Sequence, residues 1–270
     1  MEILVATPIK KMPERVVTGK FPVTTKKCGL LDEFVPQENL GKEKKQRAKG
    51  RVGLAAIKKA FSEQPEIVYL GEFRNTCYTS ALDSIKNLKY FSKDVALFSA
   101  CLVELQEIMS FSARAGFFLS ALINNCPESD FSLHLGALST PIRYLGHQNT
   151  KNITVFGSVG EYIGESMKGG SITVHGNVEH CAGSSMHGGK ITIKGNAGST
   201  LGTSMNGGTI IVEGDSGAVG ACMKGGTILV KGKIGSISMI PPFGPTGGNI
   251  FEGKRQVLKD GKVVGAIQYS

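Results

Sequence analysis

The segments SMKGGSITVHGN (166–177) and SMHGGKITIKGN (185–196) are two copies of one sequence motif that recurs along the chain. Around its isoleucine, each copy alternates apolar and non-apolar residues, which indicates a strand with one buried face. Glycines interrupt every copy at short intervals, so a helix does not fit between the strands. The motif therefore predicts short strands that are joined by tight turns at glycine.

The copies recur at a nearly constant spacing. The glycine that follows each strand returns after 19, 19, 19 and 18 residues. Repeats of this length bury little surface alone and must stack on their neighbours. We take seventeen residues as the structural repeat: Gly157, Met167, Gly169, Gly170, Gly176, Met186, Gly188, Gly189, Gly195, Met205, Gly207, Gly208, Gly214, Met223, Gly225, Gly226 and Gly232.

Stacking such repeats gives a mainly β fold, a single-stranded β-helix or solenoid in which one repeat makes one turn. Neighbouring coils would lie about 4.8 Å apart, the ordinary distance between strands. We expect five or six coils, with FSLHLGALSTPIRYLGH (131–147) as a degenerate first coil and KRQVLKDGKVVGAIQY (254–269) as a terminal hairpin. Three interior columns are expected, formed by the methionines above, by Ile153, Ile172, Ile191, Ile210 and Ile228, and by Val155, Val174, Ile193, Val212 and Val230.

The rest of the chain divides by composition. Residues 1–65 form a basic, partly extended segment with one helix near 52–61; residues 1–60 hold 14 Lys and Arg against six Asp and Glu. Residues 66–130 are expected to be helical, with a start at Ser92, a stop at Asn125 and a break at Gly116. Residues 131–270 form the β-helix domain with its C-terminal cap. We expect the helical segment to cover the open end of the coil, because an exposed sheet edge invites aggregation.

The sequence holds no motif that we can assign to catalysis. Gly-x-Gly, which the dinucleotide fingerprint requires, does not occur, and neither does a phosphate-binding P-loop or a nucleophile elbow. The six cysteines lack metal-ligand spacing and are interpreted as reduced and structural. His175, His180 and His187 are interpreted as surface residues. We expect no catalytic, cofactor-binding or metal-binding residue in this chain.

The repeated glycine and methionine pattern resembles a known family, the GXGXG domain. It is carried by GSVGEYIGESMKGGSITVHG (157–176) and GNAGSTLGTSMNGGTIIVEG (195–214), and it covers about residues 131–253. The family includes the β-helical subunit of tungsten or molybdenum formylmethanofuran dehydrogenase, the related part of a bacterial formyltransferase/hydrolase complex, and the C-terminal domain of the large chain of glutamate synthase. The resemblance implies a right-handed β-helix. It does not extend over residues 1–125.

The resemblance also implies a non-catalytic scaffold in an oxidoreductase or formyl-transfer complex, docking larger enzyme subunits of the hydrolase, molybdopterin or flavin type. Tungsto- or molybdopterin, flavin and metals would then lie in those partner subunits. A stand-alone relative of the glutamate synthase domain, supporting an amidotransferase, is an alternative. Another is a binding protein whose basic N-terminal segment holds a polyanion. We do not expect nucleic acid, because residues 42–59 contain no aromatic residue to stack on bases. No segment is apolar enough to cross a membrane, so we expect a cytoplasmic protein.

Overall fold

A computed structural model describes residues 53–64, 73–238 and 243–264. The chain divides into two units, 1–40 and 41–270, and all described residues belong to the second. Most of the basic segment therefore lies outside the described residues. The same holds for the end of the expected terminal hairpin, beyond residue 264.

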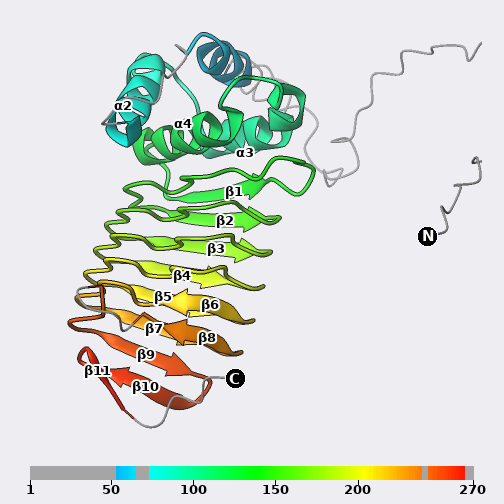
Figure 1. Ribbon diagram of the computed structural model, residues 1–270. Coiled ribbons are helices and arrows are strands. Elements are labelled where there is room, and N and C mark those ends of the chain that lie inside the picture. The colour runs from blue at the N-terminus through cyan, green and yellow to red at the C-terminus, as the bar shows by residue number, and fades with distance from the viewer. Residues whose placement is uncertain (1–52, 65–72, 239–242, 265–270) are drawn as a thin grey trace, which may run out of the picture. The chain divides into compact units, whose positions relative to one another are not determined.

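The repeats form a parallel β-solenoid of about six turns, as the spacing predicts. One strand of every turn joins a long sheet in which equivalent residues face each other, for example Ile153 opposite Ile172. Two further strands pair in a second, smaller sheet. The parallel strands of the long sheet are β1 (Asp130–His134), β2 (Asn152–Phe156), β3 (Ser171–His175), β4 (Lys190–Ile193), β5 (Thr209–Val212), β7 (Thr227–Val230) and β9 (Asn249–Glu252), and those of the second sheet are β6 (Ser216–Val219) and β8 (Ile234–Ile237) (Figure 1).

The three interior columns are confirmed. Every isoleucine, valine and methionine assigned to them is at most 2% exposed, and the four methionines are completely buried. The degenerate first coil is also confirmed, because β1 pairs in register with β2. Stacking places chemically identical side chains on one another, so the interior fills without a change of packing from coil to coil.

In two doublets, a methionine of the preceding coil lies against the second glycine. Gly208 has φ +91°, and a Cβ built on it would lie 2.7 Å from Cε of Met186 in the preceding coil. The same clash recurs between Gly226 and Met205 at 2.6 Å. Backbone oxygens of the preceding coil lie 2.9 and 2.8 Å from the same two Cβ positions, so moving the methionine alone would not make room. The side chains of Met186 and Met205 therefore occupy space that the next coil leaves open by having glycine.

Helices precede the solenoid. Residues 53–62 are helical, as expected for the region near 52–61. They are followed by α2 (Phe73–Ile85), α3 (Ser92–Cys101), the short 3₁₀ helix η2 (Leu102–Leu105) and α4 (Phe111–Asn125). The expected start at Ser92 and stop at Asn125 are confirmed.

The expected break at Gly116 is wrong, because this residue lies inside α4. A Cβ at Gly116 would overlap the carbonyl oxygen of Arg143 in the first coil. The glycine therefore allows the helix to approach the solenoid backbone closely, and it does not end the helix.

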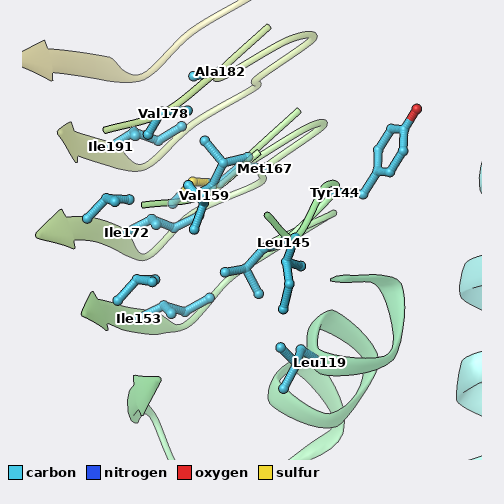
Figure 2. Close-up of a cluster of buried hydrophobic side chains, with 14 of the residues drawn as sticks. Leu119, Tyr144, Leu145, Ile153, Val159, Met167, Ile172, Val178, Ala182 and Ile191 are labelled. Atoms are coloured by element: carbon cyan, nitrogen blue, oxygen red, sulfur yellow. The ribbon is translucent and has the colours of Figure 1, made fainter. Parts of the chain in front are cut away.

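The helices cover the first coil of the solenoid. α3 packs on β1, where the backbone N–H of His134 donates to Oγ of Ser99 at 2.9 Å. From α4, Oγ of Ser120 accepts the N–H of Gly146 at 2.9 Å. Figure 2 shows Leu119 of α4 beside Leu145 of the first coil, within one buried core that includes both. The helical segment thus acts as the cap that its position in the sequence suggested.

The other end of the solenoid is closed by antiparallel strands. After β9 the chain reverses into β10 (Arg255–Lys259), which pairs antiparallel with β9, and β10 then pairs with β11 (Lys262–Val263). These strands are the described part of the expected terminal hairpin. Their antiparallel direction ends the series of parallel coils.

The methionine column can be tested at Met186, which is completely buried, with His187 as an exposed neighbour. We expect Met186→Ala to lower the free energy of unfolding by about 2–5 kcal/mol, because the site cannot collapse between two rigid coils. His187→Ala should change it by less than about 0.5 kcal/mol. Chemical denaturation followed by circular dichroism measures both, and equal stabilities would contradict the interior column.

The close approach of α4 can be tested by Gly116→Ala. In an isolated helix this change stabilises by about 1 kcal/mol, but here the overlap with Arg143 should reverse the sign and lower the melting temperature. Gly169→Ala is the matched control, because a Cβ there meets no atom within 4 Å. A melting temperature of Gly116→Ala at or above that of the unmodified chain would show that the helix does not need the glycine.

Candidate functional site

The surface histidines lie where the sequence predicts them. His175, His180 and His187 are all exposed. Within the described ranges, no group of three or more His, Cys, Asp and Glu residues is arranged to hold a metal ion. No helix within those ranges is long and apolar enough to cross a membrane.

A buried carboxylate between α2 and the first two coils is the most unusual polar feature of the described chain. The side chain of Glu165 is only 3% exposed. Arg74 of α2 pairs with one of its oxygens through Nη1. Nδ1 of His147 lies 3.3 Å from the other oxygen, an electrostatic contact without the alignment of a hydrogen bond. Helix α2 and two adjacent coils therefore meet at one carboxylate.

Two tyrosines form the wall beside Arg74. The rings of Tyr144 and Tyr162 stack at 4.9 Å between centroids. The guanidinium carbon of Arg74 lies 4.7 Å from the centroid of Tyr162 and 5.5 Å from that of Tyr144. A cation over an aromatic ring is attracted to the negative face of the ring. The tyrosines therefore help to hold Arg74 over the solenoid.

His147 is held by contacts from two helices. Its ring meets Tyr78 edge-on at 5.0 Å and Phe117 at 5.3 Å. Nδ2 of Asn124 donates to the hydroxyl of Tyr78 at 2.9 Å and to the carbonyl of His147 at 3.0 Å. These contacts connect α2, α4 and the first coil in one network.

Electrostatics favour a charged Arg74 beside neutral tyrosines. Burial lowers the pKa of Arg74, but Glu165 and the tyrosines outweigh it and the net shift is upward. Burial raises the pKa of the phenols of Tyr144 and Tyr162, so both rings stay neutral at physiological pH. A buried carboxylate is tolerated only with such a partner. We interpret the Arg74–Glu165–His147 cluster as a latch that joins α2 to the solenoid.

The sequence alone does not reveal this cluster. Glu165, Ser184 and Thr203 occupy equivalent positions in successive coils. The N–H of Ser166 donates to the C=O of Ser184, and the N–H of Ser185 donates to the C=O of Thr203. A glutamate in a column of small hydroxyl residues, preceded there by His147, is the one signal that could have found it. Arg74 lies outside the repeats, so no periodicity could point to it.

The described cysteines are free thiols, as their spacing predicts. They are Cys77, Cys101, Cys126, Cys181 and Cys222, whereas Cys28 lies outside the described residues. Burial raises the pKa of Cys77 to about 11, so its thiol stays protonated and unreactive at neutral pH. The buried cysteines thus serve as small apolar side chains.

Comparison with protein-family models, with curated proteins and with solved structures finds no match to this chain.

The latch can be tested by Glu165→Gln, which removes the charge and keeps the shape. Because the variant leaves Arg74 without its buried carboxylate, we expect a loss of about 1.5–3 kcal/mol in the free energy of unfolding. The matched control is Glu161→Gln, whose partner Arg143 is 3.6 Å away with both side chains about one third exposed. It should cost less than about 1 kcal/mol. Equal losses in urea denaturation would show that Glu165 is not a latch.

Proposed function

We propose that this chain is a non-catalytic scaffold whose outer faces bind a larger catalytic subunit, similar to the β-helical subunit of formylmethanofuran dehydrogenase. The observation that carries the proposal is the buried apolar interior of the solenoid. Ile172, Val174 and Met186 are all 0% exposed, as are most of their counterparts in the neighbouring coils. A partner must therefore be bound by the outer faces.

The ends of the solenoid support binding at its sides. One end is covered by α3 and α4, and the other is closed by β10 and β11. Covered ends disfavour the addition of further strands to the sheet. The sides of the coils are the surfaces that a partner can then use.

The outer face at the ends of the strands is rigid and chemically varied. The rings of His134, Phe156 and His175 stack at 5.3 and 5.1 Å on successive strands. The same column continues with Glu213, whose carboxylate accepts from Nζ of Lys194 at 2.8 Å and of Lys231 at 3.1 Å. Phe156 is 42% exposed although it is large and apolar. Exposed aromatic residues on a rigid support are typical of protein-binding surfaces.

The identity of the partner is part of the proposal. We propose a hydrolase, molybdopterin or flavin protein that holds the metals and redox cofactors, with the complex in the cytoplasm. In that arrangement the solenoid sets the position of the catalytic partner and takes no part in the chemistry.

Native purification of the tagged full chain from its own organism tests the proposal. We expect a larger enzyme subunit in fixed stoichiometry that remains bound through size-exclusion chromatography. The destabilised variant Met186→Ala should retain less of it at the same expression level. Elution of the unmodified chain as a monomer without a partner would contradict the scaffold function.

A further inference from the structure

The middle column of outward residues on the long sheet changes its chemistry halfway along the solenoid. Register places seven residues of this column opposite one another in order: Ser132, Thr154, Thr173, Thr192, Ile211, Leu229 and Phe251. The first four carry hydroxyl groups and the last three are large and apolar. We name Ile211, Leu229 and Phe251 the apolar strip.

The apolar strip faces outward and is partly exposed. In β5, β7 and β9 the buried positions are the neighbours of the strip residues, such as Ile210 and Val212 around Ile211. All three strip residues lie outside the buried core. Threonine at the same column position in β2, β3 and β4 shows that the fold accepts a hydroxyl residue there. Interior packing therefore does not require apolar residues in this column.

The spacing of the strip matches an α-helix. Strands in a sheet lie about 4.8 Å apart, and one turn of a helix rises about 5.4 Å. A helix that crosses the strands would bring one apolar residue per turn, at positions i, i+4 and i+7, against Ile211, Leu229 and Phe251 in succession. An added β-strand would instead need a free sheet edge, which this face does not provide.

The strand ends beside the strip carry more lysine than unpaired carboxylate. Lys194 follows β4, Glu213 follows β5 and Lys231 follows β7. Both lysines pair with Glu213, which leaves one positive charge unmatched, and Glu252 of β9 pairs with Arg255. A partner with carboxylates beside its apolar positions would be complementary to these strand ends.

From this spacing and charge we infer that the apolar strip binds an amphipathic helix of the partner subunit, with acidic residues on the flanks of its apolar face. The inference rests on the scaffold function proposed above and names the surface that it uses.

Photo-crosslinking of the native complex tests the occupant of the strip. A photoreactive phenylalanine analogue replaces Leu229 in the full chain, and the same analogue at Thr154 is the control on the hydroxyl half of the column. We expect Leu229 to crosslink to a helical segment of another polypeptide, with carboxylates beside its apolar residues, and Thr154 not to do so. Crosslinks from Leu229 to residues 265–270 of this chain, to a second copy of it, or to nothing would overturn the inference.

A double variant measures the contribution of the strip. Ile211→Thr with Leu229→Thr extends the threonine column and should leave the melting temperature near that of the unmodified chain, but weaken the complex by at least about tenfold. The control pair Thr154→Val and Thr173→Val should leave binding unchanged. If the threonine variant keeps full affinity, the inference fails while the scaffold function stands. If the unmodified chain forms no complex, the scaffold function fails.

Discussion

The fold depends on one constraint, the in-register stacking of equivalent residues in successive coils. Ile172 lies between Ile153 and Ile191 because the parallel strands pair without a shift. A slip by one residue would turn every interior side chain outward. The chain keeps the register even where a coil has 18 residues and not 19. The coil is shorter by one residue between Ser216 and Val219, in the second sheet. In the long sheet, β7 therefore still pairs in register with β5.

Much of this architecture could be predicted from the sequence, because the same pattern of residues occurs in several copies at a nearly constant spacing. The length of one coil, the three inner columns and the degenerate first coil all follow from the spacing of the repeated residues. Gly116 could not be understood in this way, because its reason is the carbonyl of Arg143, far away in the sequence. The Arg74–Glu165–His147 cluster was hidden for a similar cause. Glu165 and His147 share a repeat column but not its small hydroxyl side chain, and Arg74 lies outside the repeats.

The junction between helices and solenoid shows how the repeat is brought to an end. Asn149 occupies the column of the methionines, and it is completely buried. Its side chain closes on the backbone of Lys151, accepting the N–H at 3.1 Å and donating to the carbonyl at 2.7 Å. The amide satisfied by its own turn thus takes the place of the thioether in the first coil. The methionine column therefore begins one coil later, at Met167.

The contact between Met186 and Gly208, repeated between Met205 and Gly226, makes every seam between these coils nearly the same. Removing or duplicating a whole coil would join two surfaces that already fit. Evolution can therefore lengthen or shorten such a protein in steps of one full turn at little cost, while intermediate insertions must be accommodated in corners. Related chains should accordingly differ in reach along the solenoid axis and keep the same cross-section.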